Sequence, residues 1–136
     1  MGKQFALFKG LISTDTGEPV DVVMVGEKPH YVVPDAGFQR HIESKVIDRQ
    51  VLQLLRDQLE PHRDLAVREA MKMIGRDDLF TKAMIDASIN NMGQLLEQGI
   101  PEEMRAWLGM MGFRVIVDYR GDVIQLEQPG RADFDE

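Results

Sequence analysis

Three polar residues in the first half of the chain, His41, Ser44 and Asp48, have types and a spacing that could support catalysis. They are three and four residues apart, so one helix through them would place all three on the same face. A hydroxyl, an imidazole and a carboxylate together could perform acid–base or nucleophilic chemistry. Side chains on one helix face project in parallel rather than converge, however, and helix capping by Ser44 or Asp48 is a simpler explanation. A small hydrolase that uses His41 and Asp48 is therefore kept as the second alternative function.

Metal binding is another possible chemistry, because histidine and carboxylate side chains ligate zinc and non-haem iron. The histidines are His30, His41 and His62, and no pair has the His-x-x-x-His or Glu-x-x-His spacing that places two ligands on one helix face. The chain contains no cysteine, which removes thiolate metal sites, iron–sulfur clusters and disulfides. We therefore expect no metal site and no cofactor.

A stripe of basic residues runs beside the apolar positions of the middle segment. It consists of Lys45, Arg49, Arg56 and Arg63. Such a stripe could bind phosphate, a nucleic-acid backbone or an acidic partner. Acidic residues at positions 57, 60 and 64 lie close by in sequence, which favours a solvated face whose charges pair with one another.

Four further polar residues could line a ligand pocket between a sheet and the helices. They are Asn91, Ser88, Tyr31 and His30. Asn91 and Ser88 fall within an otherwise apolar arc of a predicted helix, where a buried amide must find hydrogen-bond partners. A hydrogen bond from Asn91 to the backbone of a neighbouring turn is the simpler interpretation. A small-ligand-binding or sensor domain is the first alternative function.

These residues must be positioned by a set of strands and helices that the hydrophobic pattern predicts. Strands are expected over residues 5–12, 20–25, 30–33, 113–119 and 123–126, and helices over 37–44, 44–59, 61–74, 77–99 and 101–112. The order of strands, helices and strands predicts an α+β fold. We expect one antiparallel sheet, built from the N-terminal strands and a C-terminal hairpin and packed against a central block of about four helices. Residues 1–127 are expected to form a single domain, followed by a flexible acidic tail over 128–136.

The segment 77–99 is predicted to be one long helix with apolar residues on two adjoining faces. An ordinary surface helix has a single apolar stripe, so this helix should be covered on two sides. The first face carries Leu79, Phe80, Ala83, Met84, Ala87 and Leu95. The second carries Ile85, Ile89, Met92 and Leu96, and we expect this side to form a subunit interface.

Composition narrows the class of protein. The net charge of the 136 residues is −7 and the last third carries most of it, so nucleic-acid binding is disfavoured. No apolar run is long enough to span a bilayer, and no signal peptide is recognisable, so we expect a cytoplasmic protein without membrane contact. Nine methionines, mostly in the helical half, suit adaptable packing surfaces. The leading prediction is a non-enzymatic scaffold or regulatory module that forms a homodimer through its helical face and contacts protein partners.

Overall fold

The structure is a computed structural model that describes residues 5–128. It has an α+β fold, as the sequence predicts, and it contains two compact units. The sheet unit comprises Met1–Val51 together with Leu95–Glu136, and the helical unit comprises Leu52–Gln94. The tail predicted to be flexible lies outside the described residues, except for Gln128.

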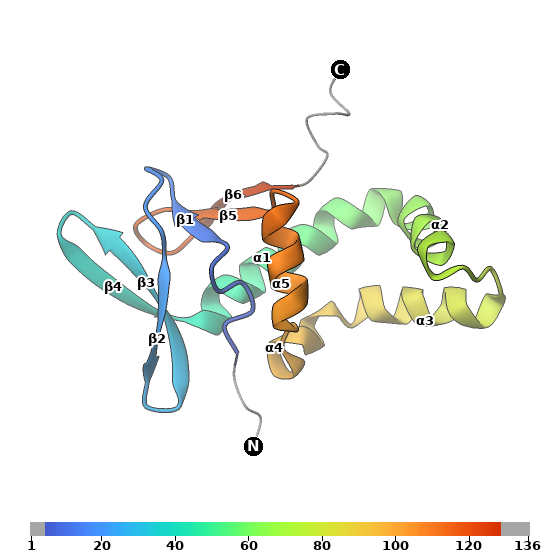
Figure 1. The fold of residues 1–136 in the computed structure, drawn as a ribbon, viewed down its shortest axis with the longest axis horizontal. Helices are drawn as coiled ribbons and strands as arrows, with labels where there is room; N and C mark the ends of the chain where they lie inside the picture. Colours follow the sequence, from blue (N-terminus) through green and yellow to red (C-terminus); the bar gives the residue numbers. More distant parts are fainter. Residues whose placement is uncertain (1–4, 129–136) are drawn as a thin grey trace. The chain divides into compact units, whose positions relative to one another are not determined.

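Both sheets belong to the sheet unit (Figure 1). The strands are β1 (Ile12–Thr14), β2 (Asp21–Val25), β3 (Lys28–Asp35), β4 (Phe38–Glu43), β5 (Arg114–Val117) and β6 (Val123–Glu127). The helices are α1 (Ser44–Leu59), α2 (Arg63–Ile74), α3 (Leu79–Asn90), α4 (Leu95–Gln98) and α5 (Glu102–Met110), with short 3₁₀ turns η1 (Glu60–His62) and η2 (Met92–Gln94). Helix α1 begins in the sheet unit and ends in the helical unit.

The strands form two three-stranded sheets instead of the single antiparallel sheet that we expected. One sheet has the order β2-β3-β4 and is antiparallel; the other has the order β1-β5-β6, in which β1 pairs with β5 in parallel. The expectation failed because residues 5–11 do not form a strand. Only Ile12 of the predicted first strand belongs to β1, and its carbonyl accepts a hydrogen bond from Val20 N–H at 3.1 Å as the chain turns toward β2.

The segment predicted as a helix over 37–44 is strand β4. Asp35 pairs with Phe38 across a two-residue loop, Ala36–Gly37, in which both residues have positive φ. Positive φ at both central positions is typical of the turns that join tightly paired strands, because their twist matches that of the strands. The strands predicted over 20–25 and 30–33 form an antiparallel hairpin, β2 and β3, with Gly26 at positive φ in its turn.

The long helix predicted over 77–99 is interrupted. It starts as expected, since the Asp78 carboxylate accepts hydrogen bonds from both the backbone and the hydroxyl of Thr81. Helix α3 ends at Asn90, and Asn91 leaves helical geometry with its side-chain amide donating to the Ala87 carbonyl at 2.9 Å. A side chain that bonds the preceding turn competes with helix continuation, and Gly93 lowers helix propensity just beyond it.

The core of the sheet unit forms where residues 6–12 meet β3, α1 and β5. Its largest fully buried side chains include Tyr31, Phe8, Leu7 and Ile47. Phe8 and Phe113 lie with ring centroids 5.9 Å apart, and Gly109 on α5 lies close against Leu11. Helix α5 therefore packs on the N-terminal segment through the side that carries Gly109.

The turn Arg120–Asp122, between β5 and β6, is tied to the sheet unit by Gln50 on α1. The Gln50 amide donates to the Gly121 carbonyl at 3.2 Å, and its oxygen accepts from Val123 N–H at 2.9 Å. Gly121 has a φ of +86°, and an added Cβ would collide with Ile42. The turn has a structural role, in agreement with the hairpin that the sequence predicts there.

We expect Gly121→Ala to destabilise the protein more than Gly17→Ala. Both glycines have left-handed φ, which raises the energy of an alanine by roughly 1–2 kcal/mol. Only Gly121 also faces a neighbour, so displacing Ile42 should add roughly 1 kcal/mol. Urea denaturation measures the difference, and in an Ile42→Val background the excess should disappear. Equal destabilisation by the two alanines would show that Gly121 is not packed as described.

Candidate functional site

The N-terminal segment of the sheet unit is held by a buried carboxylate. Asp48 on α1 accepts the Leu7 N–H at 2.9 Å and the Tyr31 hydroxyl at 2.6 Å. The Tyr31 oxygen in turn accepts the Phe8 N–H at 3.1 Å. Three donors thus meet three acceptor oxygens, a complete pairing for the ionised form of the carboxyl.

Two further side chains bind the backbone of the same segment. Ser44, the first residue of α1, donates through its hydroxyl to the Phe5 carbonyl at 3.0 Å. Arg105 on α5 donates to the Ala6 carbonyl at 3.4 Å. Because residues 5–8 lack a strand partner, side chains bind several of their backbone groups, in addition to the turn hydrogen bonds from Lys9 N–H to the Ala6 carbonyl and from Leu11 N–H to the Phe8 carbonyl.

Burial dominates the electrostatics of this cluster. Asp48 has no exposed surface, and burial raises its pKa to about 7, while the hydrogen bonds from Tyr31 and Leu7 act in the opposite direction by favouring the charged form. Burial, and next the neighbouring Asp48 charge, raises the pKa of Tyr31, which stays protonated and donates. The carboxyl of Asp48 therefore titrates near neutral pH.

The structure separates the three residues that suggested catalysis. His41 lies on β4 and not on a helix with the others; it is exposed, and its ring Nδ1 contacts the Gln39 carbonyl at 3.1 Å. Ser44 and Asp48 are buried on α1, and the hydrogen bonds described above connect them to the backbone of residues 5 and 7 and to Tyr31. The premise of one shared helix face was wrong for His41, because Ala36–Gly37 forms a strand turn.

The four residues proposed to line a pocket belong to different units. Tyr31 is fully buried in the cluster with Asp48, and His30 contacts the Lys28 carbonyl at 3.0 Å through its ring nitrogen. Ser88 and Asn91 are exposed, and each donates to a carbonyl of the preceding helical turn. The backbone hydrogen bond that we expected of Asn91 is thus confirmed.

The predicted basic stripe is partly engaged in ion pairs. Lys45 pairs with Glu43 at 3.8 Å, whereas Arg49 is exposed and Arg56 is half-buried. Arg63 is the most strongly engaged. It pairs with Glu60, with Asp86 at 3.5 Å, and donates to the Asn90 side chain at 2.8 Å. The Glu60 carboxylate and Asp86 raise the pKa of Arg63, so its charge is fixed in the structure.

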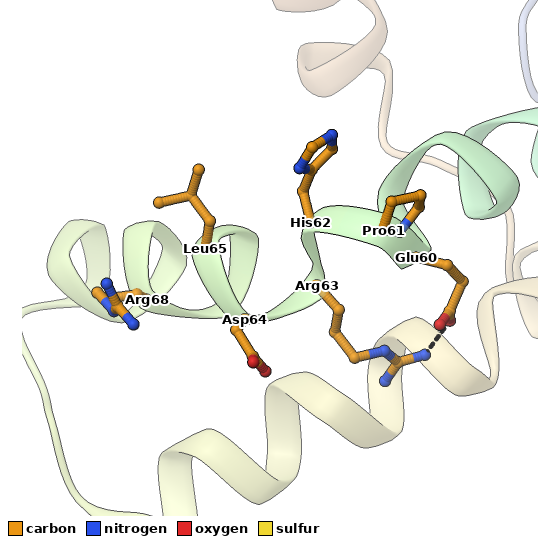
Figure 2. A pocket seen from close by; sticks show the side chains of 7 residues that line it. All are labelled: Glu60, Pro61, His62, Arg63, Asp64, Leu65 and Arg68. Carbon is orange, nitrogen blue, oxygen red and sulfur yellow. Dashed lines mark hydrogen bonds and ion pairs between the residues drawn. The ribbon is translucent and has the colours of Figure 1, made fainter.

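A hollow of about 490 Å³ surrounds η1 in the helical unit. Its lining side chains are Glu60, Pro61, His62, Arg63, Asp64, Leu65 and Arg68. Figure 2 shows that His62 and Leu65 point to one side while Arg63 turns to the other side and meets Glu60. The lining side chains do not converge on a common point, so the hollow lacks the arrangement of a catalytic or metal centre.

Helix α3 exposes the apolar face that we expected to be covered within the chain. Leu79, Phe80 and Met84 are 85%, 71% and 55% exposed. We call this surface the α3 outer face; it consists of Leu79, Phe80, Ala83, Met84 and Ala87, all of them exposed. A solvent-facing apolar stripe on α3 is therefore present, but on the other side of the helix.

Two of the residues predicted as the subunit interface, Ile85 and Ile89, lie on the opposite, covered side of α3, whereas Met92 lies in η2 and Leu96 in α4 of the sheet unit. Ile89 is buried, and Ile85, Met92 and Leu96 are half-buried. The structure thus reverses the assignment of the two faces. The sequence shows two apolar faces but contains no signal that tells which of them meets α2.

A second apolar surface lies on α5. We call it the α5 outer face; it consists of Met104, Trp107, Met110 and Met111, which are all exposed. Trp107 is 52% exposed and Met110 84% exposed. Next to it lies a shallow hollow of about 350 Å³, lined by Pro101, Glu103, Met104 and Trp107.

No group of three or more histidine, cysteine or acidic residues in the described part of the chain could hold a metal ion. Every helix within residues 5–128 is too short or too polar to cross a bilayer. Comparisons of the chain with known protein families, curated proteins and solved structures find no match. A functional proposal therefore rests on the geometry of the chain itself.

We expect the stability of the protein to fall as the pH rises from about 4 to about 7. Asp48 has a pKa near 3.8 when unfolded and about 7 when folded, so the folded chain binds more protons in this range. The free energy of unfolding then falls by on the order of 4 kcal/mol across this range, and Asp48 causes no further change at higher pH. Urea denaturation at a series of pH values measures the effect as the difference between the wild type and Asp48→Asn, which lacks the ionisable group.

Tyr31→Phe provides the control. It keeps the carboxyl but removes a hydrogen bond to its charged form, so the fall should extend to higher pH. Three other carboxyl groups have lowered pKa values, those of Glu43, Glu60 and Asp78, so they make stability rise with pH. Their contribution is the same in the wild type and in both variants and cancels in the differences. Parallel stability curves for wild type and Asp48→Asn would contradict the burial of an ionisable Asp48.

Proposed function

We propose that this protein is a non-enzymatic module that self-associates and acts by protein–protein contact, as a scaffold or regulator. The observation that carries the proposal is the α3 outer face, where two large side chains, Leu79 and Phe80, are more than two-thirds exposed next to each other. Large contiguous apolar patches are uncommon on monomeric proteins and usually mark interaction sites.

The composition of the exposed surface supports a protein partner. Leucine, phenylalanine, methionine and tryptophan are the large side chains of the α3 and α5 outer faces, and aromatic residues and methionine are enriched at protein interfaces. Methionine side chains are flexible and polarisable, so they adapt to a partner surface. The net charge of −7 disfavours a nucleic-acid partner. A homodimer is the simplest assembly, because C2 dimers are the commonest oligomers, and we place it in the cytoplasm.

The two alternative functions receive less support from the geometry. A hydrolase that uses His41 and Asp48 needs an accessible base, whereas Asp48 has no exposed surface and its oxygens already accept two hydrogen bonds. The residues proposed for a ligand pocket are engaged otherwise: Tyr31 is fully buried and donates to Asp48, and the exposed Asn91 donates to the Ala87 carbonyl.

Self-association is tested by gel filtration with light scattering over micromolar to hundred-micromolar concentrations. We expect a dimer whose mass falls on dilution, and we expect Met84→Glu to weaken it by about tenfold or more, because a buried charge is unfavourable without a partner. Val25→Glu is the matched control: Val25 is a half-exposed apolar residue on β2 and belongs to neither helix face. A wild type that remains monomeric throughout would remove the proposal.

A further inference from the structure

We propose that the dimer is formed by pairing the α3 outer face of one copy with the α5 outer face of the other, twice, around a two-fold axis. This inference rests on the proposed self-association and specifies its geometry. In such an isologous interface, residue i contacts residue j of the partner and residue j contacts residue i.

The exposed area argues for using both faces. From their exposed fractions, the large side chains of the α3 outer face present roughly 450 Å² and those of the α5 outer face roughly 550 Å². A stable interface buries about 800 Å² per partner. Neither face alone reaches this area, whereas the two together do, and both are exposed in the same chain.

Shape also favours the pairing. The α5 outer face has a hollow of about 350 Å³ between Pro101, Met104 and Trp107, and this hollow is lined mainly by apolar atoms. The α3 outer face offers a projecting aromatic ring, Phe80, which is 71% exposed. A rigid aromatic side chain seated in an apolar hollow is the usual form of an interface hot spot.

The test uses two single variants of the protein, Phe80→Lys and Trp107→Glu, which are studied by gel filtration with light scattering. Each variant alone places a charge in both contacts of its dimer, so each should dimerise about 100-fold more weakly than the wild type. In an equimolar mixture, the introduced ammonium meets the introduced carboxylate in one contact, and the other contact is wild type. The mixture should therefore regain dimer mass where each variant alone is monomeric.

Several results would overturn this pairing. If Trp107→Glu remains dimeric while Phe80→Lys does not, the interface joins two α3 faces, and self-association stands without this geometry. If both variants are monomeric and their mixture is too, the two faces do not meet. A monomeric wild type removes self-association itself. Circular dichroism shows whether each variant folds, and Val25→Lys alone should remain dimeric, because its α3 and α5 outer faces are unchanged.

Discussion

A buried carboxylate that binds backbone is the constraint on which the sheet unit depends. Asp48 connects α1 to Leu7 N–H and to the Tyr31 hydroxyl of β3, so one side chain joins the N-terminal segment, a helix and a sheet. Two large effects oppose each other at the Asp48 carboxyl. Burial disfavours the charge, while the hydrogen bonds favour it, and the result is a carboxyl with a pKa of about 7. A hydrophobic residue at this position could not accept the hydrogen bonds from Leu7 N–H and the Tyr31 hydroxyl.

The same cluster determines which side of α5 faces water. Arg105 donates to the Ala6 carbonyl and Gly109 lies against Leu11, so the side of α5 that carries them meets the N-terminal segment. The side with Trp107 and Met110 is consequently left exposed. Packing within the chain thus satisfies the backbone of the N-terminal segment while leaving apolar helix surface outside. This uncovered surface is the α5 outer face, which adds to the α3 outer face as support for the proposed protein contact.

The fold class and most helices could be predicted from the sequence because period and caps are local signals: Asp78 caps α3, and a glycine at positive φ, Gly75, ends α2. The sheet arrangement could not be predicted, because the apolar run over 5–12 has the pattern of a strand. Its backbone is instead bound by Asp48 and Tyr31, which are distant in the sequence. The exposed faces were assigned to the wrong sides for a related reason. Hydrophobic periodicity shows that a face is apolar but contains no information about its neighbour.

Trp107 is the chain's single tryptophan, and its fluorescence reports directly on the α5 outer face. The measurement is its emission wavelength as a function of protein concentration, with mass recorded in parallel. If a second copy covers this face, the emission should shift to shorter wavelength as the concentration rises, with the same midpoint as the rise in mass. Emission that stays constant while the mass doubles would contradict the account, because the dimer would then leave the indole of Trp107 in water.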